Sequence, residues 1–545
     1  MRSFVYTIIT ILTSIIHQIT VSAINVGRDD VQPWQRLADA LNISDYETLS
    51  ALQRAVRGSS NGTHETEKAQ EACSISQAVF KGKLISPQQS TLYTNRTETN
   101  WSDNCWQNAS CIVSPESAQD VARIMTIITF TQTTFAVRSG GHDFNVNHSS
   151  VGRNGILVDM ANFNNITLSA DKSTVTIGVG ARWGDVYNAL NGSGVSVNGA
   201  RSPNPGVGGQ TLGGGIGWFS NLAGVSAASV IAAEVVLANS TIVRASQESH
   251  PELLWALKGG GPNYGIVTSF TYRTLPIDKM WFEARLYTRD KNQQLLNALV
   301  AYQEMASNDS KANIVYQLSE NTTAPQSFVG FLYLDPVEYP SVFSPFYDIP
   351  HTVNMIDSTI GTLADLSSMY NDPQYPQTPP SRDYVVSLPH RVDNATYQES
   401  YAAFTTYAEQ AFAAGWTMNY GSQPISTNAV QASSDTPLNL TLVDQDWVHV
   451  TIEWYSAEDD AQAMGLIRSM GQSIAMSASQ HGSDLAYRFM NDAYDGQAVL
   501  SSYGAGNMEK LWKISQAYDP EGVFQRLQNG GWLLSREVAS MHDAR

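Results

Sequence analysis

The 545 residues of this chain include 32 Lys and Arg against 50 Asp and Glu, which gives a formal net charge of −18. Apolar residues make up 42% and charged residues 15%, a balance that excludes wholesale disorder. A strongly acidic surface without a block of Lys or Arg would repel nucleic acid and anionic membranes, so neither is expected as a partner.

The first 23 residues predict a secretory signal peptide. Arg2 supplies a positive start, residues 4–20 are mostly apolar, and Val21-Ser22-Ala23 is a small-residue cleavage site. An N-terminal membrane anchor is the alternative, because the apolar stretch approaches the roughly 20 residues that span a bilayer. No later stretch is long and apolar enough for that. We therefore expect a secreted protein, or one in the lumen of the secretory pathway, with no membrane association after residues 1–23 are removed.

The density of Asn-X-Ser/Thr triplets agrees with secretion. About a dozen occur along the chain, and each is a potential site for an N-linked glycan. They include Asn42, Asn61, Asn95, Asn108, Asn165, Asn239, Asn321 and Asn439. One such triplet means little, but this density favours a glycoprotein.

The three cysteines, Cys73, Cys105 and Cys111, all lie in one N-terminal stretch. In an oxidising compartment they predict one disulfide and one free thiol. Spacing does not decide which two of them pair. No histidine lies at ligand spacing beside them, so no metal site is expected.

Taken in chain order, helices and strands mix from the start. Residues 24 to about 67 predict a helical or partly ordered lead-in, and Ser114-Pro115 has the pattern of an N-cap followed by a first-turn proline. A helix should follow, because apolar residues recur at helical spacing from Val121 to Ile128. The next expected elements are strands at 135–138, 155–160 and 174–180 and a helix at 182–190.

Further along, residues 230–237 and 241–245 predict a hairpin around Asn239-Ser240, before a helix at 251–258 and a strand at 265–272. This order indicates an α+β domain and not a simple doubly wound sheet. After Pro276 the glycine motifs stop, so residues 276–480 predict a second domain. Its last expected elements are a strand at 447–455 and a helix from Glu458, and the tail carries a helix at 508–517.

Two glycine-rich turns are the candidate ligand contacts. In Arg138-Ser-Gly-Gly-His142, two glycines after a strand let successive backbone N–H groups form a nest for an anion. Residues 206–217 form a second run, and the pair suits a diphosphate with a nucleoside at one end and a flat ring at the other. Either turn alone is more often an ordinary turn. A Rossmann fingerprint is rejected, because the second run lacks a βαβ frame and an acidic residue at the expected distance.

Four motifs together carry a family resemblance. They are Arg138-Ser-Gly-Gly-His142, the Gly-Val-Gly-Gly run from Gly206, Trp255-Ala-Leu-Lys-Gly-Gly-Gly-Pro-Asn-Tyr-Gly-Ile-Val267, and Tyr518-Asp-Pro-Glu-Gly-Val-Phe524. In this order they resemble the berberine-bridge-enzyme-like branch of the vanillyl-alcohol-oxidase flavoproteins, and most of all its secreted fungal FAD-linked members from secondary metabolism and the carbohydrate oxidases beside them.

The resemblance implies a fold and a division of the chain. The fold is α+β, with a PCMH-type FAD-binding domain of two α/β subdomains and a substrate domain whose antiparallel sheet is backed by helices. The FAD-binding domain would take residues 24–275 and the substrate domain residues 276–480. Residues 481–545 would return to the FAD-binding domain.

The resemblance also implies roles for the matching residues. His142 would bond covalently to the 8α-methyl carbon of the flavin, with a structural histidine at a turn as the alternative. The expected FAD contacts are Arg138, Ser139, Gly140 and Gly141 at the pyrophosphate; Gly206, Val207, Gly208, Gly209, Leu212 and Gly213 along the flavin and diphosphate; Gly265, Ile266 and Val267 at the adenine and ribose; and Tyr487 and Asn491 near the ring.

The chain departs from the family pattern at two positions. Many relatives attach the flavin twice, through a cysteine four residues before Gly-Val-Gly-Gly, where this chain has Ser202. The resemblance therefore implies a single covalent bond, through His142, with no cysteinyl bond. Pro205 stands where relatives carry a residue that governs access of oxygen, so oxidase and dehydrogenase behaviour both stay open.

A flavin oxidation also needs a group that takes a proton from the substrate. His449, Glu453 and Tyr455 are the candidates, because they alternate onto one face of a predicted strand of the second domain. A salt bridge or a rim position is the alternative for each. The resulting expectation is an oxidase that transfers a hydride from a small organic substrate, a secondary metabolite, to FAD, with O₂ as acceptor. The alternatives are a carbohydrate oxidase acting at the anomeric carbon and a secreted binding protein that has lost its flavin.

Overall fold

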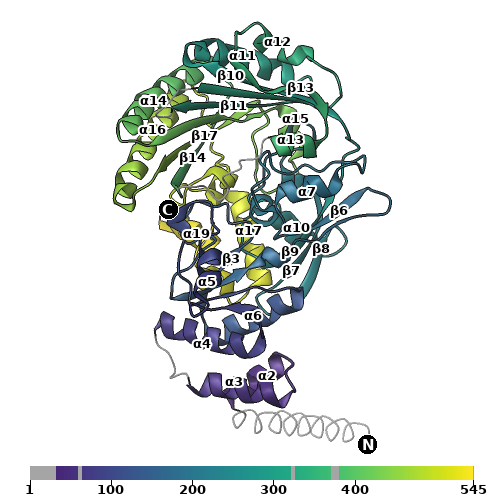
Figure 1. The fold of residues 1–545 in the computed structure, drawn as a ribbon, viewed down its shortest axis with the longest axis vertical. Coiled ribbons are helices and arrows are strands. Elements are labelled where there is room, and N and C mark those ends of the chain that lie inside the picture. Colours follow the sequence, from purple (N-terminus) through teal and green to yellow (C-terminus); the bar gives the residue numbers. More distant parts are fainter. Residues whose placement is uncertain (1–31, 59–63, 321–325, 370–379, 544–545) are drawn as a thin grey trace, which may run out of the picture.

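The computed structural model describes residues 32–58, 64–320, 326–369 and 380–543, which form three β-sheets and the helices around them (Figure 1). The predicted signal peptide and the triplets at Asn61 and Asn321 lie outside the described residues. Within the described residues, no helix is both long enough and apolar enough to cross a bilayer. The predicted α+β class is confirmed.

The first sheet is small and mixed. Its strands, in sheet order, are β1 (Leu84–Ile85), β2 (Cys111–Val113), β4 (Gly155–Asp159) and β3 (Thr134–Arg138). β2 and β3 run parallel to β4, and β4 is buried along its whole length. Parallel strands need cover on both faces, and α6 (Ala118–Thr131) supplies an apolar stripe for one of them.

The N-terminal helices extend this first unit. The expected helical lead-in is confirmed as α2 (Pro33–Ala40) and α3 (Tyr46–Gly58), followed by α4 (Glu65–Val79). Cys73 of α4 forms a disulfide with Cys111 of β2, and Cys105 is a buried free thiol, so the expected pattern of one disulfide and one thiol is confirmed. The predicted helix start at Ser114 is wrong, because the N-cap is Ser117, whose side chain accepts from the N–H of Asp120.

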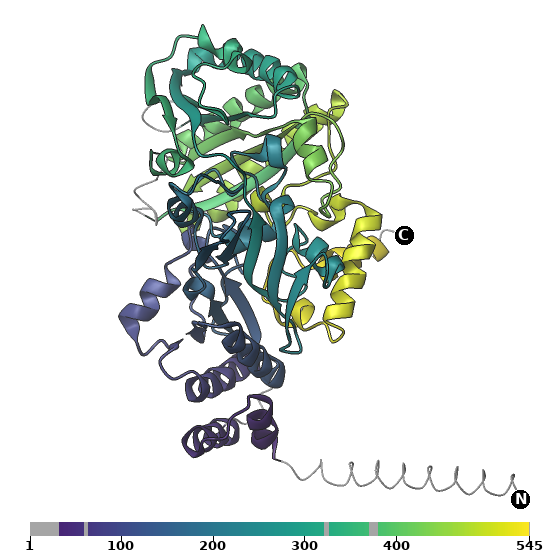
Figure 2. The same cartoon turned by 90° about the vertical axis from the view of Figure 1, so that its right-hand side faces the viewer.

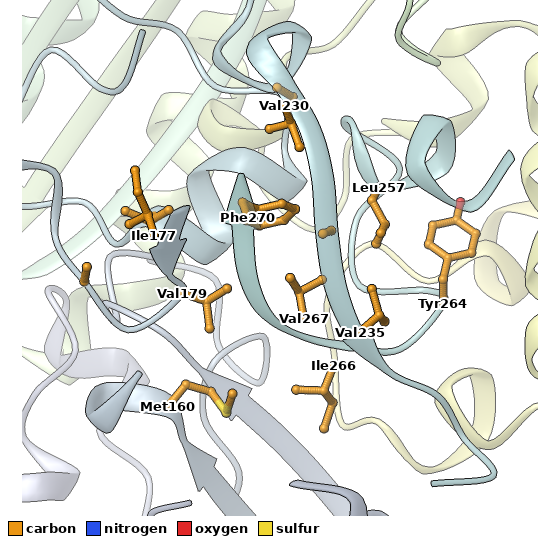
Figure 3. Packing of buried hydrophobic residues seen from close by; sticks show 14 of the residues in the cluster. Met160, Ile177, Val179, Val230, Val235, Leu257, Tyr264, Ile266, Val267 and Phe270 are labelled. Carbon is orange, nitrogen blue, oxygen red and sulfur yellow. The ribbon is translucent and has the colours of Figure 1, made fainter. Parts of the chain in front are cut away.

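The second sheet contains the predicted hairpin. Its strands, in sheet order, are β5 (Ile166–Leu168), β6 (Thr174–Gly178), β9 (Ile266–Arg273), β7 (Val230–Val236) and β8 (Ile242–Ser246), all antiparallel. The helices between these strands are α7 (Trp183–Leu190), α8 (Val207–Leu212) and α10 (Pro251–Leu257). Residues of this sheet and the first sheet share one apolar core, in which Figure 3 shows the side chains of Met160, Val179, Ile266 and Val267.

The third sheet occupies the predicted substrate domain, in the upper half of Figure 1. Its main path, in sheet order, is β13 (Val353–Gly361), β10 (Met280–Thr288), β12 (Gln326–Tyr333), β11 (Ala312–Glu320), β15 (Thr417–Ser422), β17 (Gln445–Trp454) and β14 (Arg382–Arg391), with β16 (Pro424–Ile425) paired to β17. Every pairing is antiparallel.

Three long helices pack on one face of this sheet. They are α11 (Asn292–Ala306), α14 (Asn394–Ala413) and α16 (Asp460–Gln480). Strand β17 shows how the two faces divide: Val448, Val450 and Ile452 are buried in the core formed with these helices. The alternating residues, His449 and Thr451, point to the other face, because side chains alternate along a strand.

The C-terminal segment returns to the first two sheets. Its helices are α17 (Ala505–Tyr518), α18 (Val523–Leu527) and α19 (Leu534–Asp543), and the yellow C-terminal helices lie beside the teal strands of the second sheet in Figure 2. Gln528 forms an isolated parallel bridge with Phe135 of β3, and Leu511 and Phe524 are buried in the core of the first two sheets. Segments far apart in sequence thus surround one region, between the glycine turns and the third sheet.

Candidate active site

A cavity of about 480 Å³ lies where all of these parts meet. One wall consists of the two glycine-rich turns, and the opposite wall consists of residues of the third sheet and of the C-terminal segment. The predicted flavin contacts that line it are Ser139, Gly140, Gly141, His142, Gly206, Gly208, Gly209, Leu212, Gly213, Gly265, Ile266, Val267 and Asn491. The structure therefore brings together residues that are as far apart in the chain as Ser139 and Asn491.

The two glycine turns touch each other through their backbones. A Cβ on Gly140 would lie 2.5 Å from the backbone nitrogen of Gly206, and a Cβ on Gly206 would lie 2.4 Å from that of Gly140. Neither position has room for a side chain. Arg182 fixes the first turn by donating from Nη2 to the carbonyl of Gly140 at 2.6 Å. The backbones of the two turns can therefore pack directly against each other.

The short helix α8 follows the second turn and is tied to the C-terminal segment. Asn491 donates from Nδ2 to the carbonyl of Gly209 at 3.3 Å, and its Oδ1 accepts from the N–H of Gly215 at 3.1 Å. A Cβ on Gly213 would lie 2.3 Å from Nδ2 of Asn491. Gly213 thus allows the amide of Asn491 to close this side of the cavity.

His142 lies at the cavity in a fixed orientation. Its imidazole stacks on the ring of Trp101, with the ring centroids 5.0 Å apart and an angle of 16° between the planes. The backbone N–H of Trp101 donates to the carbonyl of Gly141 at 2.8 Å, which holds the two segments together. Burial lowers the pKa of His142 to about 4, and the positive charge of Arg182 acts in the same direction. The imidazole is therefore neutral at pH 7.

Arg138 is not among the residues that line the cavity, so its predicted contact with the pyrophosphate stays a prediction. The guanidinium is buried, and its Nη2 lies 2.9 Å from Oδ2 of Asp159 at the end of the neighbouring strand β4. Its Nη1 donates to Oδ1 of Asn100 at 3.3 Å. Arg138 therefore stabilises the segment that leads into the glycine turn through contacts outside the cavity.

Two other predicted contacts also lie away from the cavity. Val207 is fully buried in the core, as an apolar residue of a short helix with one face inward would be. Tyr487 packs on Trp447 and Tyr503. The aromatic residue of this segment that does line the cavity is Phe489, two positions later and next to Met490. The predicted contact of Tyr487 with the ring therefore stays a prediction.

The wall formed by the third sheet contains His449 and Thr451 of β17, Val385 of β14, and Gln423 between β15 and β16. The imidazole of His449 lies over Gly421, its register partner on β15. A Cβ on Gly421 would come within 2.1 Å of Cε1 of His449. Gly421 therefore provides the space in which this imidazole lies.

Glu453 and Tyr455 are not among the residues that line the cavity, so the structure lends no support to their prediction as proton acceptors. Tyr455 lies beyond the end of β17 and is 51% exposed, and its hydroxyl donates to the carboxylate of Glu453. Glu453 is the register partner of Asp383 on β14. Strand alternation was right for all three candidates, but the cavity reaches only as far along β17 as Thr451.

Sequence reasoning missed several residues of this wall. Asp492 follows the predicted Asn491, and Arg201 precedes Ser202, so both lie beside positions that the family pattern marks. Gln423 and Gly421 belong to no recognisable motif, so sequence analysis had no basis for placing them in this wall. Within the described residues, no group of three or more His, Cys, Asp and Glu side chains is arranged to hold a metal ion.

Comparisons with known proteins agree with this architecture. A family model described as an FAD binding domain matches residues 109–246. An FAD-dependent monooxygenase of Arthrobotrys oligospora is 36% identical over 469 residues, which cover 85% of this chain and 90% of that protein. The bifunctional solanapyrone synthase of Alternaria solani is 31% identical over 500 residues, or 90% of this chain and 94% of that protein.

The fold is also found among solved structures. BBE-like 1 of Physcomitrella patens superposes with a TM-score of 0.67 at 17% sequence identity, over 82% of this chain and 96% of that one. This chain belongs to the same family of FAD-dependent oxidoreductases as these relatives, and it has the fold of the berberine-bridge-enzyme-like proteins. The predicted family and an FAD-dependent enzyme are thereby confirmed.

The cavity of this berberine-bridge-enzyme-like oxidoreductase suits FAD. The two turns present backbone groups without side chains, which lets a diphosphate approach closely. Ile266, Val267, Val179 and Met160 give an apolar wall for flat rings. Gly209 lines the cavity, and a Cβ built there meets no atom within 4 Å, so the space in front of it is open to a ligand.

Gly209→Ala is expected to fold normally and to hold less FAD. A methyl group that overlaps a bound cofactor costs about 1–3 kcal/mol, which corresponds to binding that is roughly 5- to 150-fold weaker. Gly465→Ala is the matched control, because Gly465 is also exposed within a helix with no atom within 4 Å of its Cβ, but lies away from the cavity. The ratio of flavin absorbance to protein absorbance measures the effect. Equal FAD content in the two variants would place the cofactor elsewhere.

Proposed function

We propose that this chain is a secreted FAD-dependent oxidase that removes a hydride and a proton from a small organic substrate. FAD, when bound, accepts the hydride and passes the electrons to O₂, which leaves as H₂O₂. The observation that carries the proposal is the single cavity that contains both glycine turns, His142 and the polar face of the third sheet. The chain's own residues orient the substrate, exclude water and take up the proton.

We propose that His142 attaches FAD covalently, at the 8α carbon of its ring. A neutral imidazole has a free electron pair on one ring nitrogen, and the low pKa of about 4 keeps His142 neutral over most of the pH range. Stacking on Trp101 fixes the plane of the ring, which limits the directions from which the nitrogen can react. A bond here would anchor one end of the cofactor.

We propose that this bond is the only covalent one. The position four residues before Gly206 is Ser202, which lines the cavity but carries no thiol. Cys73 and Cys111 are joined to each other, and Cys105 is not among the lining residues. All three cysteines of the chain are therefore unavailable for a second attachment.

His142→Ala is expected to lose the covalent flavin completely. Holoprotein is precipitated with acid, and flavin fluorescence is compared between the pellet and the supernatant. His148→Gln is the matched control, because His148 also lines the cavity and should retain the flavin in the pellet. Fluorescence that stays with the His142→Ala polypeptide would contradict the assignment, and mass spectrometry of the peptide that contains residue 142 gives a second measure.

We propose His449 as the group that takes the substrate proton. It is the one sequence-predicted candidate that lines the cavity, and the apolar residues Val385, Phe489 and Met490 line the same cavity. Low polarity strengthens a proton transfer to a positioned base, because few waters compete for the proton. His449→Asn should therefore slow flavin reduction by about 100-fold while leaving the flavin attached.

We propose a secondary metabolite as substrate, and the name of the Alternaria solani relative, a solanapyrone synthase, supports this choice. A panel of phenols, polyketide alcohols and oligosaccharides, screened for peroxide, tests it. Activity confined to sugars would instead establish a carbohydrate oxidase. Incorporation of an oxygen atom from labelled O₂ into the product would establish a monooxygenase, as the name of the Arthrobotrys oligospora relative says of that protein.

We propose secretion, on the strength of the N-terminal leader and of the surface. The described members of the triplets named above are all exposed: Asn42, Asn95, Asn108, Asn165, Asn239 and Asn439. The disulfide between Cys73 and Cys111 also suits an oxidising compartment. Protein recovered from the culture medium should begin after Ala23 and should run faster on a gel after glycosidase treatment.

A further inference from the structure

Behind His449 lies a chain of polar contacts that the proposed function does not yet use. Arg201 donates from Nη1 to Oε1 of Gln423 at 2.8 Å. Gln423 in turn donates from Nε2 to Oδ2 of Asp492 at 2.7 Å and to the carbonyl of Trp447 at 3.1 Å. The amide of Gln423 is thus fixed in one orientation, with its oxygen toward Arg201 and its nitrogen toward the carboxylate.

The carboxylate held in this way faces His449. Oδ2 of Asp492 lies 3.8 Å from Nδ1 of His449, just beyond hydrogen-bond length. Nδ1 is buried and has no hydrogen-bond partner, whereas Nε2 is not among the buried atoms that lack a partner. The side chain as a whole is 27% exposed and lines the cavity. Nε2 is therefore the ring nitrogen that the cavity can reach.

The position of His449 is set from both sides. The imidazole lies directly over the backbone of Gly421, where any side chain would overlap the ring. A buried ring nitrogen without a partner is unfavourable, and a small movement toward Asp492 removes that penalty. Contacts between catalytic groups are often long without substrate and shorten when it binds.

We propose that Asp492, held by Gln423 and Arg201, is a positioning residue that keeps the proton of His449 on Nδ1 and leaves Nε2 free to accept the proton of the substrate. This inference rests on the proposed function of His449 as the proton acceptor. The carboxylate accepts from Nδ1–H and balances the charge when His449 becomes an imidazolium. No co-reactant is needed, because the step moves one proton from the substrate to Nε2.

Few charged groups lie near His449 and Asp492. Asp492 and Arg201 come from the C-terminal segment and from the loop before the second glycine turn, and Asp446 binds the backbone N–H of Gln423 from β17. The register partners of His449 are Ser387 and Gly421, neither of which titrates. Burial raises the pKa of Asp492, and His449 opposes that rise. The nearest negative charge to the imidazole is thus the carboxylate of Asp492.

The test uses diethyl pyrocarbonate on the holoenzyme at pH 7, because this reagent acylates only an unprotonated imidazole nitrogen that it can reach. The rate at His449 is followed by mass spectrometry of its peptide, with the rate at His148 as an internal reference. Asp492→Leu removes the acceptor, so the proton moves to Nε2 and the rate at His449 should fall about fivefold or more. Asp492→Asn should react at the wild-type rate, because Gln423 orients the amide oxygen toward Nδ1.

A second measurement distinguishes the effect of the negative charge of Asp492 from an effect on the structure of the site. Flavin reduction by the substrate found in the peroxide screen is followed without O₂ as a function of pH. In Asp492→Asn the acidic limb of this profile should move to lower pH by about one unit, because the neighbouring negative charge is lost. Asp495→Asn is the matched control, since Asp495 is exposed and does not line the cavity. A merely structural role would lower the rate at every pH without moving the limb.

The outcomes keep the two proposals apart. A wild-type acylation rate in Asp492→Leu, or an unmoved acidic limb in Asp492→Asn, overturns the positioning role even if His449→Asn is inactive. Full flavin reduction in His449→Asn overturns the proposed proton acceptor itself. If Asp492→Leu does not fold, Gln423→Leu takes its place, because it frees the carboxylate from its support and should lower the acylation rate in the same direction.

Discussion

Asp383→Asn is expected to be more stable than the wild type at pH 8 and to match it at pH 4. Asp383 lies on β14, is 2% exposed, and accepts from Oγ of Ser381 at 3.0 Å. Burial raises its pKa to about 8, and the negative charge of Glu453 on the paired strand adds to the rise. The carboxyl is therefore protonated in the folded protein at neutral pH, but ionised in the unfolded chain.

The direction in which the free energy of unfolding changes with pH follows from which state binds the proton of Asp383 more tightly. Because the folded state binds the proton more tightly, the contribution of Asp383 to the free energy of unfolding is complete below pH 4 and is lost progressively as the pH rises to about 8. The total loss is a few kcal/mol. An asparagine cannot ionise, so Asp383→Asn lacks this loss. The difference in the free energy of unfolding should therefore grow from pH 4 to pH 8.

Urea unfolding of the holoprotein at several pH values measures this difference. Asp357→Asn serves as the matched control, because Asp357 is exposed on the edge strand β13 and should leave the pH dependence unchanged. Glu453→Gln should reduce the pH dependence in part, since it removes the second cause of the raised pKa. Parallel curves for the wild type and Asp383→Asn would show that Asp383 is ionised in the folded protein.

The raised pKa of Asp383 also indicates a different role for Glu453. It was a reasonable candidate for a proton acceptor, because period-two alternation placed it on the same face of the strand as His449. The structure shows that it faces another carboxyl, at the end of the sheet where β14 meets the loop around Ser102, whose Oγ accepts from the N–H of Asp383 at 2.7 Å. Periodicity identified the face of the strand, but only the packing of distant segments decides which part of that face borders a cavity.

Local patterns predicted most of the first two sheets. The hairpin around Asn239-Ser240 appears as β7 and β8 with the expected antiparallel pairing, and the strand before the first glycine turn ends at Arg138 as expected. Such elements depend on turn residues and alternation within about ten positions. The start of α6 was misplaced by three residues, because Ser114-Pro115 and Ser117 both have N-cap chemistry and only tertiary packing selects one.

The third sheet and its side of the cavity were less accessible to sequence reasoning. Its order, with β15 between β11 and β17, brings Gly421 beside His449 although 28 residues separate them. Gln423 and Asp492 meet across 69 positions. No local pattern reports such pairs, since the polar residues that line a cavity have no period of their own. The glycine turns were predictable because backbone approach restricts the residue type at each position.

Arg138→Met is expected to lower the free energy of unfolding by about 3 kcal/mol or more, because it leaves the carboxylate of Asp159 buried without its main partner. Both side chains are 2% exposed and lie 2.9 Å apart. Arg96 lies 3.6 Å from the same oxygen, but it is 35% exposed and compensates only in part.

The double variant Arg138→Met/Asp159→Asn removes the buried carboxylate that has lost its partner. It should therefore recover part of the lost free energy of unfolding. Lys311→Met is the control, because its ion pair with Asp335 is nearly half exposed on both sides and should change stability little. Since Arg138 ends β3 directly before the glycine turn, the single variant should also bind FAD more weakly, although the side chain does not reach the cavity. A variant with normal stability but weak FAD binding would show instead that Arg138 contacts the cofactor directly, as the family motif implied.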